Sequence, residues 1–175
     1  MKRLTVEVIE DPRGLRAFIR FPEILYQDDP CWVPPLRRDE RARLSASNPF
    51  FAHADARLFI ARRDREVVGR VAAIVDRWMD GAGFFGFFEA IADDSVAGSL
   101  YEAVRGWLRA QGLAVLRGPF NPSTNDVCGL LTDGFQYPPR IMMPHNPSYY
   151  PTLLERVGPW VSFCAYQISI RPCAF

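Results

Sequence analysis

Side chains that could carry acid–base chemistry occur at two places in the chain. Glu89 ends the aromatic run GFFGFFE, and His145 and Tyr150 belong to the segment HNPSYY. A carboxylate or an imidazole can accept a proton, and a phenol can donate one. The pattern predicts a general base at Glu89 or His145 and a general acid at Tyr150. Two simpler interpretations stay open: Glu89 as a solvated cap at a strand end, and Asn146 as a helix cap beside two packing tyrosines.

The most polar stretch of the chain is the segment PFNPSTND, residues 119–126, which follows an apolar run. Ligands of α/β proteins tend to bind at the carboxyl ends of strands. This segment, together with the start of the HNPSYY segment, predicts a substrate-binding set made of Asn121, Ser123, Thr124, Asn125, Asn146 and Tyr149. The alternative is a turn in which Asn and Ser/Thr side chains satisfy their own backbone.

A strand–helix–strand unit over residues 83–118 is expected to position these side chains. Apolar residues recur at helical spacing along 96–108, between two apolar runs, so the two strands should be parallel. Asp93 and Ser95 suit the N-terminus of the helix, and Gly112 suits its end. Gly86 interrupts the first strand, either as a bulge that separates two strands or as a tight packing contact under the helix.

The rest of the chain predicts a strand at residues 4–9, a helix from Pro12 that Pro22 interrupts, and a short helix at 37–44. A hairpin should join strands at 56–62 and 67–76. After the central unit, the pattern indicates a short strand at 141–143, a helix from Asn146 to Val157, and a last strand at 161–170.

Composition narrows the classes of function. The 175 residues predict one domain spanning 1–175, and the net charge of +1 favours neither nucleic acid nor a membrane surface as a partner. Lys2 is the only lysine, which excludes an internal Schiff-base lysine or a P-loop lysine. The four cysteines form no C-x-x-C pair, so no metal site is expected. The N-terminus lacks the apolar core of a signal peptide, and a cytoplasmic protein is expected.

Seven segments together resemble a known family: FIRFPEILY (18–26), WVPPL (32–36), NPFF (48–51), VGRVAA (68–73), GFFGFFE (83–89), GPFNPSTN (118–125) and NPSYY (146–150). They are similar to the GNAT-type acyl-CoA N-acyltransferase superfamily, and most of all to a group of uncharacterised bacterial GNAT-like proteins. The resemblance implies a mixed α/β (α+β) fold, with a mostly antiparallel sheet and helices on both faces. It also implies acetyl-CoA or another acyl-CoA as co-substrate and a small-molecule or protein amine as acceptor. The segment from 162 onward departs from the pattern, so the last strand of the fold is expected to be incomplete after 161.

The coenzyme A loop of that superfamily has the form Q/R-x-x-G-x-G/A and falls on residues 92–97, where only Ala97 fits. The resemblance places the coenzyme on the backbone of Ser95, Val96, Ala97 and Gly98, because N–H groups at a helix N-terminus bind phosphate. Asp93 and Asp94 oppose this, since a like-charge contact at about 4 Å costs about 4 kcal/mol at an effective dielectric near 20.

The tyrosine that protonates the leaving thiolate in many members of the superfamily falls on Leu154, which cannot donate a proton. Two hypotheses therefore stand. The first is an acyl-CoA-dependent N-acyltransferase with a degenerate coenzyme A loop. The second is a non-catalytic module of the same fold that binds a ligand or a partner.

Overall fold

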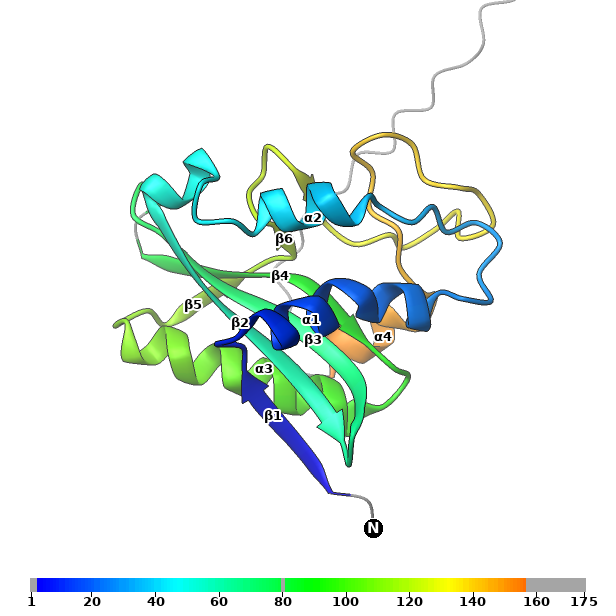
Figure 1. Cartoon of the computed structure of the whole chain (residues 1–175), viewed down its shortest axis with the longest axis horizontal. Coiled ribbons are helices and arrows are strands. Elements are labelled where there is room, and N and C mark those ends of the chain that lie inside the picture. Colours follow the sequence, from blue (N-terminus) through cyan, green and yellow to red (C-terminus); the bar gives the residue numbers. More distant parts are fainter. Residues whose placement is uncertain (1–2, 80, 157–175) are drawn as a thin grey trace, which may run out of the picture.

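The computed structural model describes residues 3–79 and 81–156 (Figure 1). Its elements, in chain order, are β1 (Leu4–Val8), α1 (Pro12–Leu25), α2 (Arg37–Arg43), the 3-10 helix η1 (Pro49–Ala52), β2 (Ala54–Arg63), β3 (Glu66–Asp76), β4 (Ala82–Ala90), α3 (Asp94–Ala110), β5 (Val115–Arg117), β6 (Phe120–Asn121), β7 (Val127–Cys128) and α4 (Tyr150–Glu155).

The main sheet has five strands in the order β1-β2-β3-β4-β5. The first three pairs are antiparallel, and β4 pairs in parallel with β5. A parallel pair needs a crossover connection, which α3 provides. The mixed, mostly antiparallel sheet confirms the predicted fold class, and the strand–helix–strand unit has the predicted orientation.

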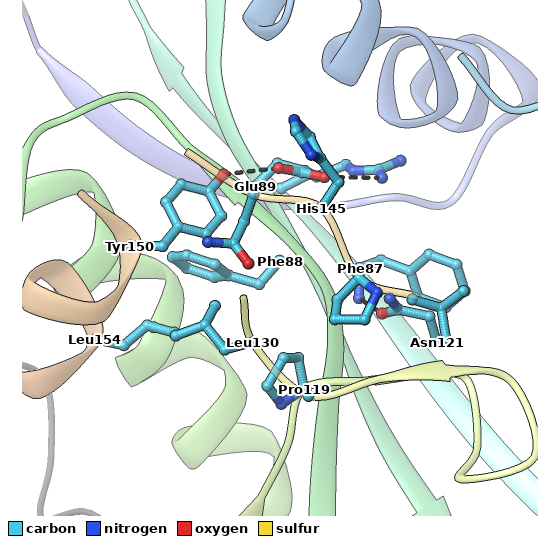
Figure 2. Close-up of a pocket in the computed structure, with 14 residues that line it drawn as sticks. Phe87, Phe88, Glu89, Pro119, Asn121, Leu130, His145, Tyr150 and Leu154 are labelled. Atoms are coloured by element: carbon cyan, nitrogen blue, oxygen red, sulfur yellow. Dashed lines mark hydrogen bonds and ion pairs between the residues drawn. The ribbon is translucent and has the colours of Figure 1, made fainter. Parts of the chain in front are cut away.

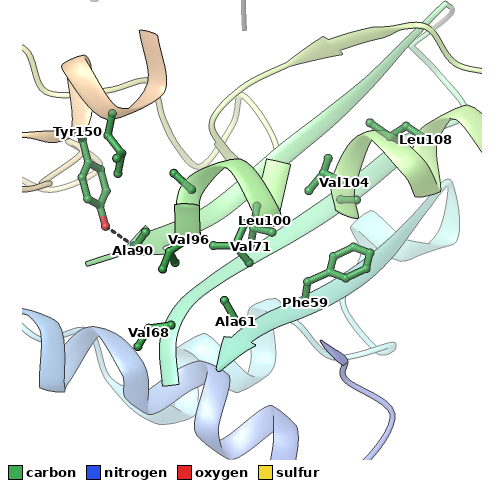
Figure 3. Close-up of a cluster of buried hydrophobic side chains, with 13 residues drawn as sticks. Phe59, Ala61, Val68, Val71, Ala90, Val96, Leu100, Val104, Leu108 and Tyr150 are labelled. Carbon is green, nitrogen blue, oxygen red and sulfur yellow. Dashed lines mark hydrogen bonds between the residues drawn. The ribbon is translucent and has the colours of Figure 1, made fainter. Parts of the chain in front are cut away.

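Helices cover both faces of this sheet. On one face, Val96, Leu100 and Val104 of α3 pack against Phe59 and Val71 (Figure 3). On the other face, Phe18 of α1 packs with a second cluster that includes Ile60, Ile74 and Phe84. Phe59 and Ile60 are adjacent in β2 and point to opposite faces, as strand geometry requires. The strands are therefore apolar on both sides.

Local signals set the ends of both long helices. The Asp11 side chain accepts a hydrogen bond from the Gly14 N–H at 2.6 Å, and Asp93 accepts one from the Ser95 N–H at 2.8 Å. Gly112, just past α3, has a φ of +77°, a conformation that glycine adopts without strain. Pro22 does not interrupt α1, because the helix continues through it to Leu25.

The structure differs from three of the expectations for the second half of the chain. Residues 141–143, expected to form a strand, lie in an exposed turn. The last helix begins at Tyr150 rather than at Asn146. Within the segment 119–126, expected to be a loop, residues 120–121 form β6, which pairs with β7. The strand expected at 161–170 lies outside the described residues.

Along the described part of the chain, no helix has the length and apolar character needed to cross a membrane.

Candidate active site

A bulge in β4 shapes the centre of the site. Arg70 of β3 faces Glu89 and Ala72 faces Gly86, so Phe87 and Phe88 together oppose one residue of β3. Phe87 has a φ of 51°, and the Asn121 side chain accepts a hydrogen bond from its N–H at 2.5 Å. The regular hydrogen bonding between β3 and β4 is thus interrupted just before Glu89, and the Asn121 side chain of β6 replaces the partner that β3 would supply to Phe87.

Gly86 is required by a close approach of the backbone next to this bulge. A Cβ atom there would lie 1.6 Å from the carbonyl oxygen of Phe120. Both interpretations of Gly86 therefore hold in part: β4 is bulged immediately after it, and the residue makes a tight contact. The contact is with β6 and not with the underside of the helix.

Glu89 lies in a largely enclosed polar cluster. Its Oε2 accepts hydrogen bonds from the hydroxyls of Tyr26 and Tyr150, both at 2.7 Å, and the Arg70 guanidinium lies 3.7 Å from its Oε1. The Glu89 side chain is 14% exposed, so the interpretation as a solvated cap is wrong. Burial raises the pKa of Glu89, although Arg70 and the two hydroxyls oppose the increase.

The tyrosines around Glu89 hold their protons firmly. Burial and the neighbouring carboxylate raise the pKa of Tyr26 and of Tyr150 well above the usual value. The Tyr150 hydroxyl also accepts a hydrogen bond from the Ala90 N–H at 2.8 Å. The Tyr149 hydroxyl donates to the Ala90 carbonyl at 2.8 Å, and burial raises its pKa to about 12. All three are phenols at neutral pH.

His145 pairs with a carboxylate that the sequence did not single out. Its Nε2 lies 2.8 Å from Oδ2 of Asp29, and the ring is tilted against that of Tyr26 with centroids 5.7 Å apart. The His145 side chain is 6% exposed. Its second ring nitrogen, Nδ1, is buried and has no hydrogen-bond partner among the residues the structure describes. A buried nitrogen without a partner is available to a ligand.

A small pocket that is partly open to solvent joins these groups (Figure 2). Its polar lining residues are Arg70, Glu89, Asn121, His145, Asn146 and Tyr150. Its apolar lining includes Phe87, Phe88, Pro119, Val127, Leu130 and Leu154. The three predicted acid–base residues thus share one pocket, although they come from β4, from α4 and from the loop before α4.

The predicted substrate-binding residues divide into two groups. Asn121 and Asn146 line the pocket, but both bind backbone: Asn146 accepts from the Leu131 N–H at 2.7 Å and donates to the Leu131 carbonyl at 3.1 Å. Ser123, Thr124, Asn125 and Tyr149 are not among the lining residues. The Ser123 hydroxyl donates to Asp126 and accepts from the Asn125 N–H, so this stretch forms the self-satisfied turn that was the alternative.

The predicted coenzyme-binding residues Ser95, Val96, Ala97 and Gly98 begin α3, away from the pocket lining. Oδ1 of Asp93 accepts the N–H groups of Ser95 and Val96, at 2.8 and 3.4 Å. Its Oδ2 lies 2.6 Å from the Arg63 guanidinium, and Arg156 pairs with Asp94. The Ser95 hydroxyl and Arg63 lower the pKa of Asp93 to about 2. Two of the four N–H groups that the predicted loop would offer to phosphate, those of Ser95 and Val96, are thus occupied by a carboxylate of the chain itself.

Two functional candidates, Tyr26 and Asp29, could not be found from the sequence. Tyr26 ends one of the segments that carry the family resemblance, which was its only signal. Asp29 is one of two adjacent aspartates, and nothing in the pattern distinguishes it from Asp28. Among the described residues, no three His, Cys, Asp or Glu side chains are grouped so that they could hold a metal ion.

Two curated proteins are similar in sequence, and no family profile matches the chain. Protein YghO of Escherichia coli K12 is 40% identical over 158 residues, which cover 87% of this chain and 40% of YghO. A bacterial ceramide synthase of Caulobacter vibrioides is 38% identical over 162 residues, covering 89% of this chain and 42% of the synthase. The chain therefore spans about two fifths of the length of each of these relatives.

Crystal structures of an aminoglycoside acetyltransferase from an uncultured soil metagenomic sample, in complex with trehalose and with sisomicin, match the fold. The TM-score is 0.54 at 11% identity, covering 94% of this chain and 96% of the acetyltransferase. At this identity the match concerns the fold alone. The chain has the mixed α/β fold of a GNAT-type acetyltransferase, with a polar pocket beside a bulge in β4.

Proposed function

We propose that the chain catalyses acyl transfer from an acyl-CoA to an amine. The observation that carries this proposal is the pocket that contains His145 and a buried Glu89–Tyr150 pair, where Nδ1 of His145 has no partner among the described residues. The similarity to a ceramide synthase supports it, because a ceramide is an amide between a fatty acyl group and an amine. By this analogy, the acceptor is a long-chain amine.

In the proposed reaction, the amine nitrogen attacks the thioester carbonyl carbon. A C–N bond forms, the C–S bond breaks, and the products are an amide and free coenzyme A. The nitrogen loses one proton, which passes to Nδ1 of His145. The departing thiolate gains one proton, which comes from Tyr150.

The Glu89–Tyr150 pair suits the delivery of that proton. Loss of the Tyr150 proton beside an ionised Glu89 would leave two anions 2.7 Å apart with no proton between them, which is unfavourable. A protonated Glu89 avoids this: the Tyr150 hydroxyl would turn from Glu89 toward the thiolate, give up its proton there and accept the proton of Glu89 in the reversed hydrogen bond. Burial raises the pKa of Glu89 and so favours the protonated form that this step requires.

The apolar side of the pocket suits an acyl chain. Phe87, Phe88, Leu130 and Leu154 line it and offer no hydrogen-bonding side chain. We therefore expect a longer acyl-CoA to bind more tightly than acetyl-CoA, since each buried methylene contributes about 0.8 kcal/mol.

Coenzyme binding at residues 95–98 requires a local rearrangement. The Asp93 carboxylate would have to leave the N–H groups of Ser95 and Val96, and Arg63 would then be free to pair with the pyrophosphate. The occupied helix terminus is the specific observation that favours the second hypothesis, a module that binds a ligand in the same pocket without turnover.

The test combines calorimetry with an activity assay on the same protein. We expect palmitoyl-CoA to bind with a micromolar Kd, more tightly than acetyl-CoA, and mass spectrometry to detect an amide with sphinganine as acceptor. His145→Gln and Tyr150→Phe should each lower kcat by about 10²-fold or more. Tyr137→Phe, at a tyrosine that is 66% exposed, is the matched control. Binding without amide formation would support the non-catalytic module, and the absence of both would exclude the acyl-CoA proposal.

A further inference from the structure

The segment between α1 and α2, residues 26–32, touches both proposed proton carriers. Tyr26 donates its hydroxyl to Glu89 at 2.7 Å, and Asp29 lies 2.8 Å from Nε2 of His145. Trp32 stacks on Tyr26 with ring centroids 5.2 Å apart and an angle of 15° between the planes. One short segment, remote in sequence from β4 and α4, therefore contacts both Glu89 and His145.

The Asp29 carboxylate is itself held in place. Its Oδ1 accepts the Cys31 N–H at 2.8 Å, which directs the other oxygen, Oδ2, to His145. Burial opposes ionisation, but the hydrogen bonds from His145 and from the Cys31 N–H outweigh it and lower the pKa of Asp29. Asp29 is thus a carboxylate at neutral pH and can only accept hydrogen bonds.

This pairing decides which nitrogen of the imidazole carries the proton. Because an ionised carboxylate accepts, Nε2 of a neutral His145 must be the protonated nitrogen. Nδ1 then carries a lone pair, and it is the nitrogen that is buried without a partner among the described residues. A lone pair buried in this way costs free energy unless a ligand supplies a donor.

We infer that Asp29 is a positioning residue that fixes the tautomer and orientation of His145, so that Nδ1 faces the substrate as the base. The inference rests on the proposed function. When Nδ1 takes the proton of the amine, the ring becomes an imidazolium next to the Asp29 carboxylate, which stabilises that charge. The other ionisable groups near His145 are Tyr26 against its ring and Arg70, Glu89 and Tyr150, which line the same pocket.

Asp29→Asn tests this role in the full chain, with palmitoyl-CoA and sphinganine as substrates. Loss of the orienting carboxylate should lower kcat by about 10²- to 10⁴-fold and leave KM within about twofold. Asp28→Asn removes the same charge from the neighbouring exposed residue and should behave as wild type.

Nitrogen-15 NMR provides a readout that does not depend on activity. The chain has two histidines, and His53→Gln identifies the signals of His145. We expect the neutral form of the wild-type His145 ring to be protonated at Nε2 and unprotonated at Nδ1. In Asp29→Asn, a population protonated at Nδ1 should appear.

The outcomes separate the two proposals. If the wild type is active and the kcat of Asp29→Asn lies within twofold of that of Asp28→Asn, the role of Asp29 is overturned. The proposed function then still stands. A wild-type His145 protonated at Nδ1 also overturns that role, even if Asp29→Asn does not fold. A wild type that forms no amide with any acyl-CoA overturns the proposed function, and the catalytic role of Asp29 with it.

Discussion

Glu89 shows how the surroundings of one residue decide its chemistry. The same carboxylate at an exposed strand end would stay ionised and solvated. Here two tyrosine hydroxyls donate to one of its oxygens, and the Arg70 guanidinium stands 3.7 Å from the other. Desolvation is the larger effect and raises the pKa of Glu89. The residue is therefore suited to exchanging a proton with Tyr150.

Glu89→Gln should change how stability depends on pH. The pKa of Glu89 in the folded chain lies above its ordinary value of 4.5, so the folded state keeps the proton to a higher pH than the unfolded state does. The contribution of Glu89 is complete below about pH 4 and declines as pH rises toward the folded-state pKa. Relative to Glu89→Gln, the wild-type free energy of unfolding should fall by at most about 1.4 kcal/mol per pH unit over this range.

Urea unfolding of both proteins at several pH values from 4 to 8 measures this difference. Glu89→Gln keeps the volume of the side chain and an acceptor oxygen for the tyrosine hydroxyls, so the comparison isolates the charge. A difference in free energy of unfolding that is constant across the series would show that Glu89 ionises in the folded chain as it does in the unfolded one.

At the scale of elements, the contact between β4 and β6 opens the sheet beside the site. The bulge at Phe87 and Phe88 changes the direction of the end of β4. The side chain of Asn121 in β6 accepts a hydrogen bond from the N–H of Phe87. Gly86 lets the β6 backbone approach so closely that a side chain has no room. The bulge and the glycine together place Glu89 in the pocket instead of in a regular ladder.

Gly86→Ala should destabilise the protein by about 1–3 kcal/mol, the usual cost of overpacking, because the new methyl group would overlap the Phe120 carbonyl. Gly106→Ala is the matched control, since Gly106 lies in α3 with no atom within 4 Å of an added Cβ. That variant should be more stable by about 1 kcal/mol, as expected for alanine in a helix. Chemical denaturation of both gives the comparison, and equal effects of the two variants would contradict the contact between β4 and β6.

At the scale of the whole molecule, the pocket is assembled from segments far apart in the chain. The pair of Tyr26 and Glu89 spans 63 residues, and that of Asp29 and His145 spans 116. Asn146 holds the loop before α4 by binding both backbone groups of Leu131. This clamp keeps His145, its neighbour in sequence, next to Asp29.

Asn146→Ala should therefore affect both stability and the site. It leaves the N–H and the carbonyl of Leu131 without partners, at a cost of about 1–3 kcal/mol. Asn125→Ala, at an exposed asparagine, should change the free energy of unfolding by less than about 0.5 kcal/mol. In the Asn146→Ala variant, the same imidazole NMR signals show whether His145 has separated from Asp29. An Asn146→Ala protein as stable as Asn125→Ala would refute the clamp.

The sequence alone determined most of the elements in the first 118 residues, because their signals are local, and the family resemblance indicated the fold class. The spacing of Val96, Leu100 and Val104, the cap at Asp93 and the end at Gly112 each involve residues within a few turns of one another. Glu89, His145 and Tyr150 could be chosen as candidates from residue type and position. The shared pocket, however, follows from the packing of segments that are distant in the chain.

Only the tertiary structure decided the partners of those residues. Tyr26 and Asp29 carry no local pattern, and their importance lies in hydrogen bonds to residues far along the chain. The predicted start of the last helix was wrong for the same reason, because the side chain of Asn146, which was placed as the helix cap, is hydrogen-bonded to Leu131 instead. Ser123 and the Asp93 carboxylate satisfy backbone N–H groups next to them, and residue type cannot distinguish this from ligand binding. A polar side chain takes the partners that folding brings within 3 Å, so its role depends on the whole chain.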